Sequence, residues 1–213
     1  MKIGYYPGCS LHATAREYDE SLQAIVPALD VELEEVKDWA CCGASSAHAT
    51  NHLLGIALPA RTLMLAAEQN LDTIFAPCAA CYNRLASAQY ALTHDPKISS
   101  KVQSILGCSM DKPMRILSIP QLLTDLTDKI QKKATAALKD VKVACYYGCL
   151  LVRPPEICQF DDPEAPVSLE NIARAAGAAP VKWNMALECC GGGFSISRTA
   201  SVVRLGRSII QSA

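Results

Sequence analysis

The feature that most constrains the fold of this chain is an internal repeat. Residues 2–9, which end in Gly8-Cys9, recur as residues 142–149, which end in Gly148-Cys149. Each copy is followed by the tripeptide Cys-Cys-Gly, at residues 41–43 and again at 189–191. Because two different landmarks recur in the same order, the repeat indicates two related units within one chain.

Short apolar runs alternate with amphipathic stretches, which is typical of an α/β fold with mainly parallel sheets. The expected strands are Lys2–Pro7, Val31–Val36, Leu71–Ala76, Arg115–Ile119, Val141–Tyr147 and Pro180–Asn184. The expected helices are Ala15–Leu29, Leu54–Gln69, Ala79–Leu92, Ile119–Leu138, Ser168–Ala176 and Thr199–Gln211. A polar stretch, Thr127–Lys139, joins the two units, and the segment Arg153–Pro166, rich in Pro and Asp, is expected to form a loop or lid.

Composition narrows the class of protein. Of 213 residues, 50% are hydrophobic, the formal net charge is −1 and the basic residues are scattered, so the chain has a core but no footprint for nucleic acid. No uncharged apolar run is long enough to cross a membrane, and we expect no membrane insertion and a cytoplasmic protein. The 11 cysteines then indicate metal ligation or thiol chemistry, because cytoplasmic thiols are kept reduced.

Five cysteines of the first unit form the candidate site: Cys9, Cys41, Cys42, Cys78 and Cys81. Thirty-one residues separate the first from the Cys-Cys pair, and 35 separate that pair from the Cys-x-x-Cys. Three of the expected strands end just before these cysteines, and parallel sheets bring such loops together at one edge. Thiolates are the preferred ligands of iron-sulfur clusters and of zinc, and neighbouring glycines let the backbone approach a bulky cluster.

The remaining candidates have competing interpretations. We expect Cys108 to be a small buried hydrophobe without function, while Cys145 and Cys158 stay open between core thiols and accessory ligands. His48 and His52 are four residues apart beside the first Cys-Cys and are able to complete a zinc site, although a role at a helix end is favoured. In each tyrosine pair, one ring is expected to be buried and the other to face a cluster: Tyr5 with Tyr6, and Tyr146 with Tyr147.

The cysteine spacing resembles the cysteine-rich CCG module that occurs twice in the B subunit of heterodisulfide reductase. The stretches that carry the resemblance are Tyr6–Ser10, Trp39–Ala44, Pro77–Asn83, Tyr147–Pro154 and Glu188–Gly191. The resemblance implies that the five cysteines of the first unit ligate a noncubane 4Fe-4S cluster. In the second unit the matching positions are Cys149, Cys189 and Cys190.

The resemblance also sets the expected modules. Residues 1–138 form a first CCG module with the complete cysteine motif, and residues 139–213 form a second, incomplete one. The sequence ends at Ala213, before the closing Cys-x-x-Cys that the family places after the second Cys-Cys, so the second module is expected to be truncated at its C-terminus. One or two clusters are expected, and zinc is possible in aerobic preparations.

The function implied by the resemblance is reductive cleavage of a disulfide between two small thiols, of the coenzyme M–coenzyme B type or an analogue. The implied partners are the iron-sulfur (C) and flavin (A) subunits of the same heterodisulfide reductase-like complex. Arg84 and Arg153 are candidates for meeting an anionic head group such as a sulfonate or a carboxylate, with a solvated surface role as the open alternative, and no catalytic acid or base is assigned. Two alternatives stay open: an electron-transfer subunit of a complex that oxidises 2-hydroxyacids or glycerol phosphate, and a zinc-stabilised scaffold.

Overall fold

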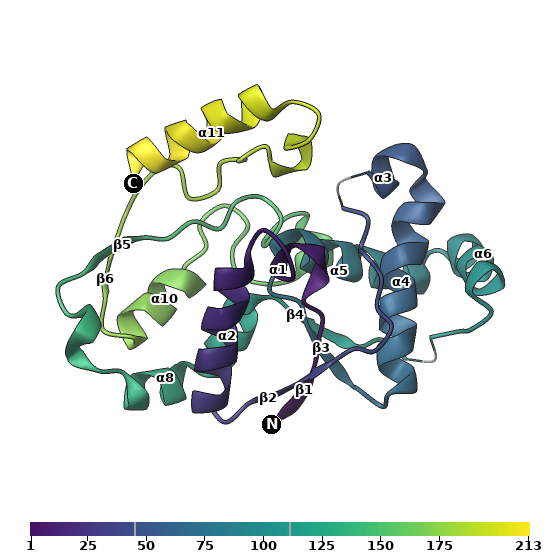
Figure 1. Ribbon diagram of the computed structural model, residues 1–213, viewed down its shortest axis with the longest axis horizontal. Coiled ribbons are helices and arrows are strands. Elements are labelled where there is room, and N and C mark those ends of the chain that lie inside the picture. The colour runs from purple at the N-terminus through teal and green to yellow at the C-terminus, as the bar shows by residue number, and fades with distance from the viewer. Residues whose placement is uncertain (45, 111) are drawn as a thin grey trace. The chain divides into compact units, whose positions relative to one another are not determined.

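The computed structural model describes residues 1–44, 46–110 and 112–213, and it divides into two compact units, Met1–Ile119 and Pro120–Ala213 (Figure 1). In both units parallel strands alternate with helices, so the predicted α/β class is confirmed. The division after Ile119 is one of spatial compactness. The boundary at 138/139 divides the two sequence modules instead, and it stays a prediction.

A four-stranded parallel sheet is the centre of the first unit. Its strands are β1 (Lys2–Tyr5), β2 (Glu32–Glu35), β3 (Thr73–Phe75) and β4 (Arg115–Leu117), in the order β2-β1-β3-β4. Apolar side chains such as those of β1 and β3 are buried, whereas β2 reads Glu-Leu-Glu-Glu and lies at the edge. Charged edge strands resist pairing with other chains, so the sheet ends at β2. All four strands lie within their predicted ranges.

Among the residues of this unit that the structure describes, six helices accompany the sheet: α1 (Gly8–Leu11), α2 (Arg16–Ala28), α3 (Ala47–Thr50), α4 (His52–Glu68), α5 (Ala79–His94) and α6 (Pro96–Leu106). Helices α4, α5 and α6 share an apolar cluster in which Ile56, Met64, Ala88 and Val102 are buried. Burial of these side chains holds α5 in place, and α5 begins directly after the cysteine Cys78.

The second unit contains a two-stranded parallel sheet of β5 (Lys142–Ala144) and β6 (Ala179–Val181). Its helical elements, with α7 starting at the unit boundary, are α7 (Ile119–Asp125), α8 (Thr127–Lys133), η1 (Ala136–Leu138), α9 (Pro155–Cys158), α10 (Ser168–Ala175), η2 (Gly192–Phe194) and α11 (Thr199–Ser212). The hydroxyl of buried Tyr147 donates to the Glu170 carboxylate and accepts from the Leu169 N–H, which joins the loop after β5 to α10.

Some expected elements were wrong in extent. The helix predicted over Ile119–Leu138 is three pieces, because Leu126 (φ −107°, ψ 8°) and Ala134 (φ −60°, ψ 136°) leave the helical region. Helix α6 was not predicted at all, and the expected loop 153–166 contains the short helix α9. In the described ranges, every helix is too short or too polar to traverse a lipid bilayer.

The residues at the start of helix α6 form an N-terminal cap, and this cap gives a first prediction. The Asp95 carboxylate accepts hydrogen bonds from the N–H groups of Lys97 (2.9 Å) and Ile98 (3.1 Å), and Pro96 occupies the first turn. We expect Asp95→Ala to lower the free energy of unfolding by about 1 kcal/mol in urea titrations, because two backbone donors lose their acceptor. Asp95→Asn retains an acceptor and is the control. Equal losses in both variants would contradict this capping role.

Candidate metal centre

Three loops of the first unit bring its five candidate cysteines to one edge of the sheet. Strands β2, β1 and β3 are neighbours and parallel, so their carboxyl ends lie side by side. Cys9 follows β1, Cys41 and Cys42 follow β2, and Cys78 follows β3 as the residue that caps α5, with Cys81 in the first turn of that helix. The edge thus gathers thiols that lie up to 72 positions apart in the chain.

The sulfur atoms approach one another in pairs. The Sγ atoms of Cys42 and Cys81 are 3.4 Å apart, and those of Cys9 and Cys41 are 3.9 Å apart. The first pair is buried and the second is exposed, while all five thiols are free. Across residues 1–44, 46–110 and 112–213, no three Cys, His, Asp or Glu side chains converge on one point as ligands of a single ion.

Hydrogen bonds between the thiols lower the pKa values of some of them and raise that of another. Contact with Cys81 lowers the pKa of Cys42 to about 7 and that of Cys78 to about 5, in both cases against the opposing effect of burial. N–H groups at the start of α5 and the side chain of Ser10 lower the pKa of Cys78 further, as expected at a helix N-terminus. The same contacts raise the pKa of Cys81. Cys78 and Cys42 are therefore the sulfurs that ionise first.

The first cysteine loop lies so close to α5 that only glycine fits at position 8. Gly8 has φ +66°, and a Cβ atom built on it would lie 2.7 Å from the Sγ of Cys81. Gly43, after the Cys-Cys pair, has φ +72°, and its N–H points at the Sγ of Cys41 at 3.5 Å. Gly8 thus keeps the space beside the Sγ of Cys81 clear, and Gly43 directs a backbone donor at the Sγ of Cys41.

A tyrosine joins two of the cysteine loops. The hydroxyl of Tyr6, which is fully buried, donates to the carbonyl of Ala40 at 2.7 Å, directly before Cys41. Burial raises the pKa of Tyr6, and so do the nearby cysteines. We expected one ring of this pair to be buried and the other to face a cluster. Both rings are buried: the hydroxyl of Tyr5 is bonded to Asp19, and Tyr6 lies beside the cysteines. Sequence reasoning missed this fixing role of Tyr6.

The second unit repeats the tyrosine and glycine contacts around three candidate cysteines. Tyr146, which stands where Tyr6 does in the repeat, donates its hydroxyl to the carbonyl of Glu188 at 2.6 Å, directly before Cys189. The Gly191 N–H points at the Sγ of Cys189 at 3.3 Å, as Gly43 points at Cys41. Burial and then the charge of Cys189 raise the pKa of Cys149. The structure therefore brings Cys149 close to Cys189, with Cys189 and Cys190 exposed.

The other candidates lie apart from these two groups. The Sγ of Cys108 is 3.2 Å from the Sδ of Met64 and packs against the apolar cluster of α4, α5 and α6. Cys145 is buried, and burial raises its pKa to about 11. The Sγ of Cys158 lies 3.4 Å from the carbonyl oxygen of Arg153, which gives it a core environment. His48 in α3 and His52 at the start of α4 are exposed.

Comparison with known proteins identifies the family. The cysteine-rich CCG domain matches residues 3–86 and 143–212, which include both groups of cysteines. The chain belongs to the CCG cysteine-rich domain family. This CCG chain is 31% identical over its whole length to the 8-methylmenaquinol:fumarate reductase membrane anchor subunit of Wolinella succinogenes. It is 28% identical over 91% of its length to a protein of Archaeoglobus profundus that is named as similar to the B subunit of heterodisulfide reductase.

A further relative is the B subunit of the ferredoxin:CoB-CoM heterodisulfide reductase of Methanosarcina mazei, at 26% identity over 92% of the CCG chain. The expected resemblance to the B subunit of heterodisulfide reductase is thus confirmed. The CCG chain spans 75%, 67% and 66% of the lengths of these three relatives, in the order given.

The chemistry of the candidate ligands fits an iron-sulfur cluster. Every candidate ligand is a thiol, the softest donor that proteins offer, and two of the five in the first unit have lowered pKa values. The cradle formed by Gly8 keeps side-chain atoms away from the Sγ of Cys81. These features match what a thiolate-ligated cluster needs.

The cradle yields a second prediction. Gly8→Ala and Gly107→Ala both place a side chain at positive φ (+66° and +70°), and we expect each to cost about 1–2 kcal/mol of stability. Only the methyl group added at position 8 collides with the Sγ of Cys81, because the space around Gly107 is open. Anaerobic reconstitution should therefore load less iron in Gly8→Ala than in Gly107→Ala. Equal iron contents in the two variants would show that the space kept clear by Gly8 does not affect the binding of iron by the cysteines.

The acidity of Cys78 yields a third prediction. Its pKa of about 5 lies below the ordinary thiol value, so the thiolate is already complete at about pH 7 in the metal-free chain. Its alkylation rate with iodoacetamide should stay flat from about pH 7 to about pH 9. The rate at Cys9, whose pKa burial raises, should climb about tenfold per pH unit over that range. Peptide mass spectrometry separates the two sites, and parallel climbs would contradict the assignment.

Proposed function

We propose that this CCG chain is an iron-sulfur redox subunit in which Cys9, Cys41, Cys42, Cys78 and Cys81 ligate a noncubane 4Fe-4S cluster. One observation carries the proposal: loops after three adjacent parallel strands bring these thiols to one edge of the sheet, four of them in two close pairs. When bound, the cluster supplies one-electron chemistry at iron held by sulfur. The chain's own part is to bury Cys42 and Cys81 away from water and to leave Cys9 and Cys41 accessible.

A second centre is proposed in the second module, which we take as residues 139–213 after a first module of 1–138. Its ligands are Cys149, Cys189 and Cys190. The support is the repeated arrangement, in which a tyrosine hydroxyl and a glycine N–H meet the Cys-Cys loop as they do in the first module.

The reaction that we propose is reduction of a disulfide between two small thiols, of the coenzyme M–coenzyme B type or an analogue. Two electrons and two protons convert one disulfide into two thiols, and the iron-sulfur (C) and flavin (A) subunits of the complex deliver the electrons in the cytoplasm. Two relatives that match over at least 91% of the chain carry names that refer to the B subunit of heterodisulfide reductase. Protein thiols held as ligands are withdrawn from exchange with the substrate disulfide.

A specific observation favours a second candidate. The relative from Wolinella succinogenes matches the whole chain at 31% identity, above the 26–28% of the heterodisulfide reductase relatives, and its name is that of a quinol:fumarate reductase subunit. In that role the chain passes electrons between partner subunits and binds no disulfide. The two candidates share the cluster and differ in whether a small thiol reaches it.

The fourth prediction tests both parts. Reconstituted anaerobically, wild type and Cys108→Ser should contain equal iron and acid-labile sulfide. Cys81→Ser should lose the share of both that belongs to the first centre and keep the share of the second, because Cys81, unlike Cys108, is a proposed ligand of the first centre. After oxidation, the electron paramagnetic resonance signal should change when a small thiol is added. A cluster whose signal ignores thiols would favour the electron-transfer role. Zinc without iron, or equal loss in both variants, would remove the proposal.

A further inference from the structure

Each unit has one tryptophan, and in both units its ring packs on a tyrosine. Trp39 lies in the loop after β2, and Trp183 lies in the loop after β6. The rings of Trp39 and Tyr6 meet edge to face, with centroids 5.3 Å apart and planes at 89°. Those of Trp183 and Tyr146 are 6.3 Å apart and inclined at 62°. Both pairs have the tilted geometry that aromatic rings prefer.

The tyrosine in each pair is the one that fixes a Cys-Cys loop. The hydroxyl of Tyr6 donates to the carbonyl of Ala40 at 2.7 Å, and that of Tyr146 donates to the carbonyl of Glu188 at 2.6 Å. Each carbonyl belongs to the residue directly before a Cys-Cys pair. A tyrosine hydroxyl stays on one carbonyl only while both side-chain torsions of the residue are restricted. A tryptophan ring packed against the phenol ring supplies that restriction.

Each tryptophan is anchored in turn by its indole N–H. The Nε1 of Trp39 donates to the carboxylate of Glu35 at 2.7 Å, and the ring of His12 packs on the same indole with centroids 5.4 Å apart. The Nε1 of Trp183 donates to the backbone carbonyl of Cys145, also at 2.7 Å. Both indole rings are partly buried, and each is fixed by a contact that does not involve the tyrosine.

The two tryptophans do not occupy matching positions of the repeat. Trp39 stands two positions before Cys41, whereas Trp183 stands six positions before Cys189. Their indole groups also have different acceptors, a side chain in one unit and a backbone carbonyl in the other. The contact with the tyrosine is thus shared by the two units although its sequence position is not. Each unit therefore gives separate support for a role of that contact.

We propose that Trp39 and Trp183 are positioning residues that hold the Cys-Cys pairs ready to bind metal. The indole ring holds the phenol ring, the phenol hydroxyl holds a carbonyl, and that carbonyl fixes the backbone from which the next two sulfurs project. This inference rests on the proposed function, because it takes the cysteines as ligands. It adds the side chains that orient those ligands before metal arrives. Ligands held in this way pay less ordering entropy on binding.

The fifth prediction removes one indole ring. Trp39→Leu keeps an apolar side chain but loses the edge-to-face pair. In the metal-free chain, the backbone amides of residues 40–43 should exchange with deuterium about three- to tenfold faster. In the chain reconstituted anaerobically, iron should leave the first centre faster by about the same factor when a chelator is added. Trp39→Phe retains a ring and should stay close to wild type in both measurements.

A double variant tests whether the tryptophan acts through the tyrosine. In Tyr6→Phe the carbonyl of Ala40 has already lost its donor, so adding Trp39→Leu should accelerate exchange and iron release by less than about twofold. Each unit is also the control for the other. Trp183→Leu should accelerate exchange at residues 188–191 and leave residues 40–43 unchanged, and Trp39→Leu should do the reverse. Mass spectrometry of the alkylated cysteines shows which centre has lost iron.

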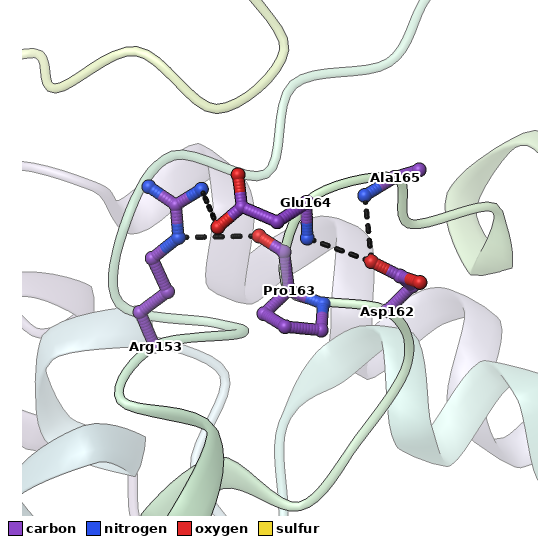
Figure 2. Close-up of polar contacts among 5 residues, drawn as sticks. All are labelled: Arg153, Asp162, Pro163, Glu164 and Ala165. Atoms are coloured by element: carbon purple, nitrogen blue, oxygen red, sulfur yellow. Dashed lines mark hydrogen bonds and ion pairs between the residues drawn. The ribbon is translucent and has the colours of Figure 1, made fainter.

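An exposed ion pair in the second unit supplies a further control. The Nε of Arg153 donates to the carbonyl of Pro163 at 3.1 Å, and a terminal nitrogen donates to the Glu164 carboxylate at 2.8 Å (Figure 2). The Asp162 carboxylate holds the same loop through the N–H groups of Glu164 and Ala165. Glu164→Gln therefore breaks a side-chain contact without freeing the loop. It should leave exchange at residues 188–191 unchanged.

The outcomes separate this inference from the proposed function. Exchange and iron release equal to wild type in Trp39→Leu overturn the inference, and so does a full effect of Trp39→Leu in the Tyr6→Phe chain. If Trp39→Leu does not fold, unchanged exchange at residues 188–191 in Trp183→Leu overturns it. Iron uptake with unchanged exchange contradicts the positioning role alone. Faster exchange in a chain that takes up no iron supports the positioning of the loops and overturns the redox function.

Discussion

Parallel pairing of β1 with β2 and β3 is the constraint on which the rest of the site depends. Because the three strands run the same way, the loops after them leave from one edge, and each of those loops carries a cysteine. An antiparallel β3 would move Cys78 to the opposite edge, about 10 Å away for a three-residue strand. The order β2-β1-β3 matters equally, since it puts the Cys9 loop between the other two. Fold and ligand set are thus one property of the chain.

The environment of the thiols is graded from buried to exposed. Cys42 and Cys81 lie in the core, while Cys9 and Cys41 face solvent, so a centre held by all of them has a protected side and an open side. The tyrosine and glycine contacts that fix the Cys-Cys loop recur in the second unit, where Cys189 and Cys190 are exposed. Duplication has preserved the backbone support of the site more fully than the burial of its sulfurs.

Sequence reasoning found all six strands of the described residues. Most of them are short apolar runs ahead of a turn or a cysteine loop, whereas β2 is a charged segment flanked by Val31 and Val36. It missed α6, whose signal is the Asp95-Pro96 cap and not a hydrophobic period. It joined α7 and α8 into one helix, because the break at Leu126 is a change of backbone angle and leucine is not a residue that predicts a helix end. The meeting of the first-unit cysteine loops at one sheet edge was predicted from their places after expected strands, while the role of these cysteines as ligands stays a prediction. The Tyr6 contact with Ala40 was not predicted, because two segments 34 residues apart meet only in the folded sheet.

The most direct measurement is thiol protection, cysteine by cysteine. The chain, metal-free or reconstituted with iron and sulfide under anaerobic conditions, is treated briefly with N-ethylmaleimide, and each cysteine is quantified by mass spectrometry. The account predicts that Cys9, Cys41, Cys42, Cys78 and Cys81 become protected together on reconstitution, while Cys108 reacts equally in both states. Protection of Cys78 and Cys81 alone, or of no member of the set, would contradict the claim that the three loops form one ligand set.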